Sequence, residues 1–231
     1  MIQITWLGHS TFELRFPSGE VLVLDPWIEG NPAYPKGYKI KKVDAIAASH
    51  AHYDHVNDLI PLAKEFSPKV VAIFETASWF EKKGVKNTIG MNKGGTVDLG
   101  FVSLTMTHAL HSCSIKDGDE LIYGGEAAGY VLTLPDGRRA YFAGDTALFS
   151  DMALIAELYA PELAFLPIGD HFTMGPHQAA HAARLLKVKR VIPMHYGTFP
   201  ALTGQPEKLA QKLQKDAIKV WTLQQGEPVE W

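Results

Sequence analysis

Short apolar segments alternate with helix-like segments along most of this chain, and that alternation limits the fold more than any other feature. Turn-forming residues bound the apolar runs, as expected for buried strands, and the segments between them have the length of short helices. Such alternation favours layered α/β packing. The sequence predicts strands at 43–48, 70–74, 102–106, 140–143, 163–168 and 190–194, and helices at 59–66, 147–159 and 176–187.

Two hairpin-like segments resemble each other. Strand-like runs at 11–16 and 21–24 flank a Pro-x-Gly turn at 17–19, and the second run leads to Asp25. Residues 134–145 likewise contain a Pro-x-Gly turn, at 135–137, and a following strand that leads to Asp145. The spacing from proline to aspartate differs between them, and chance similarity of two hairpins explains the likeness equally well. If the likeness is real, the chain consists of two similar halves packed face to face, with one site between them.

The bulk composition is that of an ordinary globular protein. The chain has 231 residues, of which 46% are hydrophobic and 20% charged, enough for a core without disulfides. We expect a single domain over residues 1–231. The formal net charge of −3 provides no general attraction to nucleic acid or to an anionic membrane. Nucleic acid is therefore not an expected partner, whereas a homo-oligomer is not excluded.

Targeting signals and membrane spans are not recognisable in the sequence. Residues 1–6 have no basic region followed by an apolar core, and no apolar run is long enough to span a bilayer. The single cysteine, Cys113, cannot form an internal disulfide, which fits a reducing compartment, and it is expected to be a small buried residue. We therefore expect a cytoplasmic protein that does not insert into membranes.

One six-residue segment is rich in metal-ligand side chains. His50, His52, Asp54 and His55 form the pattern H-x-H-x-D-H directly after the strand predicted at 43–48. Imidazole nitrogens and carboxylate oxygens suit zinc and its first-row neighbours. In an extended stretch, His50 and His52 point to the same side, so both can reach one ion, while Asp54 and His55 can serve a second. The alternative is a polar surface loop that happens to be rich in histidine.

Three further ligand-type residues follow other predicted strands. His111 comes after 102–106, Asp145 after 140–143 and His195 after 190–194. Open α/β folds place their sites at the carboxyl ends of strands. Together with the six-residue segment, these positions offer seven ligands for a two-metal site.

These motifs resemble those of the metallo-β-lactamase superfamily, over nearly the whole chain. The segments 5–11 (TWLGHST) and 24–26 (LDP) look like the branch that contains the bacterial ascorbate-6-phosphate lactonase and the N-acyl-phosphatidylethanolamine phospholipase D. The segments 90–95 (GMNKGG) and 192–199 (IPMHYGTF) look like the UPF0173 metal-dependent hydrolases. The fold that this resemblance implies is α/β, a four-layer αββα sandwich of metallo-β-lactamase type.

The resemblance also implies a ligand set for two divalent ions. The first ion takes three histidines, the second takes two histidines and an aspartate, and a further aspartate bridges both. His108 competes with His111, and His111 is preferred because it directly precedes a small polar residue, as the family's ligand does. The implied ligands are His50, His52 and His111 for the first ion, Asp54, His55 and His195 for the second, and Asp145 for both.

The activity implied is hydrolysis by a metal-bridged hydroxide, with a small ester, lactone or phosphodiester as substrate. Asp54 is expected to ligate its ion and to orient or accept a proton from the nucleophile. His171 follows the strand predicted at 163–168 and is a candidate for substrate contact or proton transfer, or else an ordinary loop residue. Zinc is the expected metal, with manganese or iron as alternatives.

Several residues have a structural interpretation beside a functional one. His9 and Asp25 are expected to be structural or to orient a ligand. His177 and His181 are four residues apart on a predicted helix. For His181 we favour an ordinary place on the helix face. For His177 the alternative to such a place is a contact with substrate. Lys36 and Lys93 are both expected on the surface, with binding of an anionic group as the alternative.

Two other function classes compete with a small-molecule hydrolase. A nuclease of the same superfamily is disfavoured by the near-neutral charge and by the lack of a basic surface or clamp domain in the sequence. A non-catalytic metal-binding module is disfavoured by the complete set of ligands.

Overall fold

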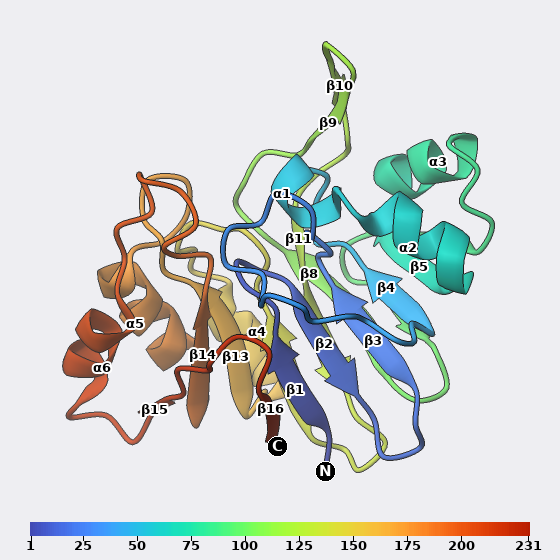
Figure 1. The fold of residues 1–231 in the computed structure, drawn as a ribbon. Helices are drawn as coiled ribbons and strands as arrows, with labels where there is room; N and C mark the ends of the chain where they lie inside the picture. The colour runs from blue at the N-terminus through green and yellow to red at the C-terminus, as the bar shows by residue number, and fades with distance from the viewer. The chain divides into compact units, whose positions relative to one another are not determined.

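The computed structural model describes all residues, 1–231, and divides into two compact units (Figure 1). The first unit contains residues 1–92, 112–127 and 223–231, and the second contains 93–111 and 128–222. Each unit has one seven-stranded sheet. The expectation of a single domain over 1–231 stays a prediction.

The sheet of the first unit has the strand order β16-β1-β2-β3-β4-β5-β6. The pairings from β16 to β3 are antiparallel, and those from β3 to β6 are parallel. A separate hairpin, β9–β10, extends from this unit (Figure 1). The elements of the first unit are β1 Gln3–Trp6, β2 Phe12–Arg15, β3 Val21–Leu24, β4 Ala45–Ala47, α1 Tyr53–Val56, α2 Leu59–Phe66, β5 Lys69–Ile73, α3 Phe74–Lys82, β6 Thr88–Met91, β9 Ser114–Asp117, β10 Glu120–Tyr123 and β16 Pro228–Glu230.

Helices α2 and α3 cover one face of this sheet. Val21, Ile46 and Val70 lie on that face and share a buried cluster with Leu59 of α2 and Phe80 of α3. Figure 1 shows both helices beside β4 and β5. The helices form because their apolar residues recur at helical spacing and can be buried against the strands. The first unit therefore has one sheet layer and one helix layer.

The sheet of the second unit has the strand order β15-β14-β13-β12-β11-β8-β7. The pairings from β7 to β12 are antiparallel, and those from β12 to β15 are parallel. Its elements are β7 Thr96–Asp98, β8 Ser103–His108, β11 Ala128–Thr133, β12 Arg139–Phe142, α4 Met152–Tyr159, β13 Leu163–Pro167, α5 Pro176–Leu185, β14 Arg190–Met194, α6 Pro206–Leu213 and β15 Lys219–Val220.

Alanines dominate the helix face that packs on this second sheet. Ala179 and Ala183 of α5 share a buried cluster with Leu166 of β13, Val191 of β14 and Leu209 of α6. Small side chains let a helix backbone approach the strands closely, and close packing maximises dispersion contacts. This unit also has one sheet layer and one helix layer.

The two sheets have the same strand pattern. In the first unit, the antiparallel hairpin β2–β3 leads into the parallel strands β4, β5 and β6. In the second, the hairpin β11–β12 leads into β13, β14 and β15. The likeness of the two hairpin sequences is therefore matched by topology, which supports two similar halves rather than chance.

Most predicted elements are present, and the largest difference is a helix start. The helix predicted at 147–159 begins at Met152. Thr146 and Ala147 are instead held in a loop, because Leu110 N donates to Thr146 Oγ1 and Ala147 N donates to Leu110 O. Phe74, predicted at the end of a strand, is the first residue of α3.

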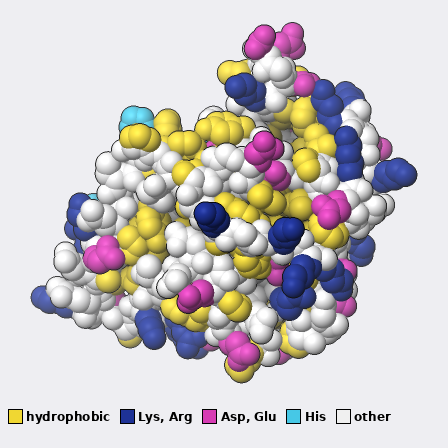
Figure 2. Space-filling view, viewed as in Figure 1, with side chains coloured by type: hydrophobic (Ala, Val, Ile, Leu, Met, Phe, Trp, Pro, Cys, Tyr) yellow, Lys and Arg dark blue, Asp and Glu magenta, His cyan; other side chains and the backbone are white.

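The structure contains no helix that is both long and apolar enough to cross a membrane. On the face in Figure 2, Lys, Arg, Asp and Glu side chains lie among hydrophobic and other side chains. The expectation that nucleic acid is not a partner remains a prediction.

Candidate functional site

In the first unit, the ends of two neighbouring parallel strands bring Asp25 and Ser49 together. Asp25 follows β3, and Ser49 follows β4. The Ser49 backbone N–H donates to Asp25 Oδ1 at 2.7 Å, and its hydroxyl Oγ donates to Oδ2 at 2.6 Å. Both residues are buried, so these hydrogen bonds compensate for the loss of hydration of the carboxylate.

Asp25 also contacts a histidine of the H-x-H-x-D-H motif. Its Oδ2 lies 2.7 Å from Nδ1 of His55, and both side chains are fully buried. Burial raises the pKa of Asp25, while His55 and Ser49 act against that rise. A carboxylate that binds one ring nitrogen of a histidine orients the other nitrogen toward a metal. The predicted role of Asp25 in orienting a ligand histidine agrees with this contact.

His50 and His52 lie side by side, as their spacing predicted. Nε2 of His50 is 2.9 Å from Nδ1 of His52, and Ser49 Oγ is 3.1 Å from Nδ1 of His50. Ligand atoms of Asp25, His50 and His55 lie within 4.8 Å of one another. His52 is the residue before the short helix α1, and Asp54 and His55 lie within that helix.

Asp54, in α1, contacts a histidine from a distant part of the first unit. Its Oδ2 lies 3.1 Å from Nε2 of His9. His9 is fully buried in a left-handed backbone conformation (φ 53°), and its ring packs edge-on against Trp27. The Trp6 indole N–H donates to the His9 carbonyl oxygen at 3.0 Å, which fixes this turn further. These contacts hold His9 in place beside Asp54.

In the second unit, Asp145 lies beside two predicted ligand histidines. Its Oδ2 is 2.9 Å from Nε2 of His195 and 3.8 Å from Nε2 of His111. Asp145 follows β12, and His195 follows β14 in a left-handed conformation (φ 56°). Both are almost completely buried. The strand ends thus gather three predicted ligands within this unit.

The hydrogen bonds of Leu110 hold His111 near Asp145, because they join the loop after β8 to the loop after β12. His108, the alternative ligand, lies within β8 instead. Its Nδ1 is 3.0 Å from Nζ of Lys93, and its ring packs edge-on against Phe149. The contact with Asp145 favours His111 over His108, and the contact with His108 gives Lys93 a local partner.

The donor set of each unit fits a divalent transition metal. Each set consists of imidazole nitrogens and carboxylate oxygens, the ligands that zinc, manganese and iron accept. The side chains are mostly buried, and charged or polar groups this close together under such burial need a counter-ion or hydrogen bonds. Within the first unit, the cluster of Asp25, His50 and His55 is able to bind metal.

The remaining histidines lie on the surface of the second unit. His171 is exposed in the loop after β13 in a left-handed conformation (φ 59°), with its ring against Phe172. His177 and His181 are exposed on α5, with ring centroids 4.9 Å apart. A role for His171 in substrate contact or proton transfer stays a prediction.

Cys113 is buried, as the sequence predicted. Its Sγ accepts a hydrogen bond from Ala51 N at 3.4 Å and donates to Gly124 O at 3.3 Å. Burial raises the pKa of the thiol. A buried thiol with a raised pKa is a poor nucleophile, so this cysteine has the features of a packing residue.

Comparison with known proteins identifies the family. A family model described as the Beta-lactamase superfamily domain matches residues 21–196. A UPF0173 metal-dependent hydrolase of Solibacter usitatus is 63% identical over 230 residues, with 100% of both chains covered. One of Methanosarcina barkeri is 42% identical over 230 residues, with 99% of this chain and 98% of that protein covered.

A solved structure supports the same assignment. A metallo hydrolase of the hyperthermophilic archaeon Ignicoccus hospitalis matches with a TM-score of 0.87 and 34% identity, covering 100% of this chain and 99% of that chain. The metallo-β-lactamase fold class expected from the sequence is confirmed by this match. The chain belongs to the UPF0173 metal-dependent hydrolases of the β-lactamase superfamily.

Proposed function

We propose that this metal-dependent hydrolase binds two divalent ions and cleaves a small ester, lactone or phosphodiester. The ligands proposed are those that the family resemblance implies. The observation that carries the proposal is the dense contact among buried His and Asp side chains at the strand ends of each unit.

In the first unit, the proposed ligands are supported by their neighbours. The contact between Asp25 and His55 Nδ1 selects Nε2 of His55 as the metal-binding atom. The short separation between the rings of His50 and His52 suits two nitrogens that share one ion. In the second unit, Asp145 Oδ2 near both His195 and His111 suits a bridging carboxylate.

Zinc is the metal that we propose, since histidine-rich sites with few carboxylates favour it, with manganese or iron as alternatives. When bound, such ions supply a water of lowered pKa as nucleophile and polarise the oxygen of the attacked group. The protein must then hold and move protons around that water.

Asp54 is the residue that we propose for proton handling. A carboxylate accepts the proton of a nucleophilic water only while it is ionised and correctly oriented. His9 lies at hydrogen-bond distance from Asp54 Oδ2, and its buried ring is held by Trp27. His9 is therefore proposed as a positioning residue that restricts the orientation of Asp54.

The experiment that tests this proposal is a screen of lactones, thioesters, phosphodiesters and β-lactams with protein purified in metal-supplemented medium. For any compound that is cleaved, Asp54→Asn should lower kcat by about 10²–10⁴-fold, the usual contribution of general acid–base catalysis. Metal content is measured in parallel, because Asp54 is also a proposed ligand.

Asp119→Asn, on the exposed turn of the β9–β10 hairpin, is the matched control and should leave kcat unchanged. A variant Asp54→Asn that keeps its metal and its full rate would refute the role of Asp54. Purified wild-type protein that contains fewer than one metal ion per chain would refute the two-ion site.

A further inference from the structure

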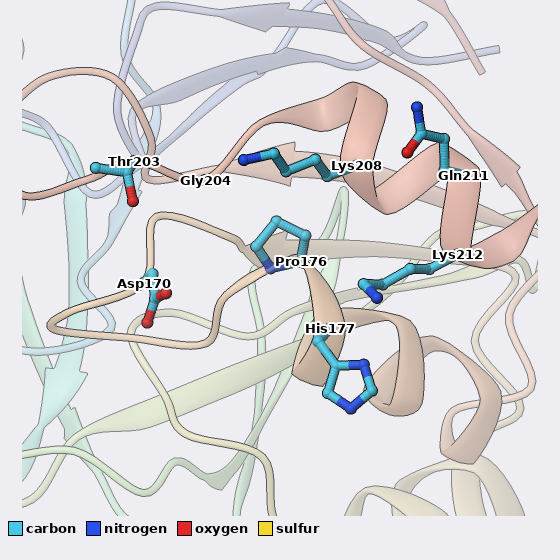
Figure 3. A pocket seen from close by; sticks show the side chains of 8 residues that line it. All are labelled: Asp170, Pro176, His177, Thr203, Gly204, Lys208, Gln211 and Lys212. Carbon is cyan, nitrogen blue, oxygen red and sulfur yellow. The ribbon is translucent and has the colours of Figure 1, made fainter.

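A pocket of about 600 Å³ lies in the second unit between α5 and α6 (Figure 3). A volume of this size is typical of small-molecule sites. Both helices and the loops that precede them contribute to its wall. The lining residues are Asp170, Pro176, His177, Thr203, Gly204, Lys208, Gln211 and Lys212.

One side of this pocket is basic. Lys208 and Lys212 are four residues apart on α6, so both side chains come from the same helix face. Figure 3 shows them with His177 of α5 around the pocket. Neither lysine has an acidic partner in the structure, whereas Arg184 on the neighbouring surface is paired with Asp216 at 2.9 Å. Two uncompensated ammonium groups in a concave site favour an anionic group.

Another part of the pocket is acidic. Asp170 lies beside Thr203 in Figure 3, apart from Lys212 and His177. Its backbone is left-handed (φ 68°), and its Oδ1 accepts a hydrogen bond from the backbone N–H of His171 at 2.9 Å. The Asp170 N–H donates to the Met174 carbonyl at 3.0 Å. A carboxylate held in this way is suited to accept hydrogen bonds from a ligand hydroxyl or ammonium group.

The pocket wall is joined to the backbone of a proposed metal ligand. Gly204 N donates to Gly169 O at 3.2 Å. A Cβ on Gly169 would lie 2.1 Å from the carbonyl oxygen of His195, so the two backbones are in close contact. The loops that form the pocket therefore pack directly against the segment that carries His195.

We propose that this pocket binds the non-reacting part of the substrate. Its ligand carries a carboxylate or phosphate group, which Lys208 and Lys212 bind, and a hydroxyl or ammonium group, which Asp170 binds. The substrate is then a small polar anion rather than an apolar ester. The binding site stands on the pocket alone, and only its assignment to the substrate rests on the proposed function.

The test is isothermal titration of the metal-loaded protein with glycerol 3-phosphate and with inorganic phosphate. We expect Lys208→Ala/Lys212→Ala to weaken binding of both by at least about tenfold, since charge-assisted hydrogen bonds are lost. Asp170→Asn should weaken binding of glycerol 3-phosphate and not of inorganic phosphate, because only the former carries alcohol hydroxyl groups on a carbon chain that extends from the phosphate. Binding should also weaken as salt increases.

The matched control is Lys215→Ala/Lys219→Ala, which removes the same charge from exposed positions of the same unit outside the pocket. An equal loss in this control would mean general electrostatic attraction and would overturn the proposal. Wild-type protein that binds neither probe, or a Lys208→Ala/Lys212→Ala variant that binds as wild type does, would also overturn it. Unchanged binding by the Lys208→Ala/Lys212→Ala variant is the result expected if phosphate binds only at the metals. Because no turnover is measured, failure of the hydrolytic proposal would leave the binding result intact.

Discussion

Asp25 contributes more to the candidate site than its place outside the H-x-H-x-D-H motif suggests. It is fully buried, adopts a left-handed conformation (φ 44°) and accepts hydrogen bonds from Ser49 while contacting His55. A non-glycine residue in this conformation carries backbone strain, which persists where the surroundings hold it. The surroundings here are the ends of two parallel strands.

Asp25→Asn should lower metal affinity by about 10–100-fold, because the amide keeps the shape but loses the charge that orients His55. Affinity is measured by competition with a fluorescent chelator. Asp119→Asn, on an exposed turn of the same unit, should bind metal as wild type does. Unchanged affinity in Asp25→Asn would show that His55 needs no such partner, or that it is not a ligand.

The contact of His9 with Asp54 could not be predicted from spacing, since the two residues are far apart in the chain. The only local signal was the Gly8-His9 sequence, which forms a turn with both residues at positive φ. The contact of Ser49 with Asp25 likewise has no local signal in the sequence. This contact depends on β3 and β4 being parallel neighbours.

At the level of elements, strand ends position the functional side chains. Predicted boundaries were accurate where apolar runs meet turn residues, as for β3, α2 and β14. The start of α4 was wrong because a tertiary contact prevailed over local helix preference. Hydrogen bonds with Leu110, one donated by its N–H and one accepted by its carbonyl oxygen, hold Thr146 and Ala147 in a loop instead.

Gly204 tests how closely the loops of the second unit pack. A Cβ there would lie 1.6 Å from the carbonyl oxygen of Ile168, so the backbone must move. Gly204→Ala should lower the free energy of unfolding by about 3 kcal/mol or more. Urea unfolding followed by circular dichroism measures it.

Gly137→Ala is the matched control for this substitution. Gly137 also lies in the second unit, has a positive φ of 85° and has no atom near an added Cβ. It should cost only about 1 kcal/mol, from backbone strain alone. A Gly204→Ala variant no less stable than Gly137→Ala would contradict the close approach.

For the whole molecule, the repeated strand pattern explains why ligand-type residues recur at similar places in both units. Asp25 and Asp145 each follow the second strand of a hairpin that leads into parallel strands. A ligand that binds these residues in the folded chain, and not in the unfolded chain, stabilises the folded state by mass action.

Addition of zinc to chelator-treated protein should therefore raise Tm by about 5–10 °C when zinc is present at 100 times its Kd. Differential scanning calorimetry measures the shift. Asp145→Asn should reduce it, whereas Asp136→Asn, in an exposed turn of the same unit, should not. An equal shift in Asp145→Asn would remove Asp145 from the ligand set.

The sequence by itself determined the class of fold, the elements and the ligand types, because these depend on local patterns. Hydrophobic periodicity reports which segments are strands or helices, and H-x-H-x-D-H is one continuous segment. Only the tertiary structure decided which distant residues contact each other. The pairs Asp25–His55, His9–Asp54 and Asp145–His195 all depend on strand order and loop packing, which no local pattern encodes. The pocket between α5 and α6 also depends on tertiary structure, since only the packing of the two helices brings Lys208 and Lys212 to the same cavity as His177.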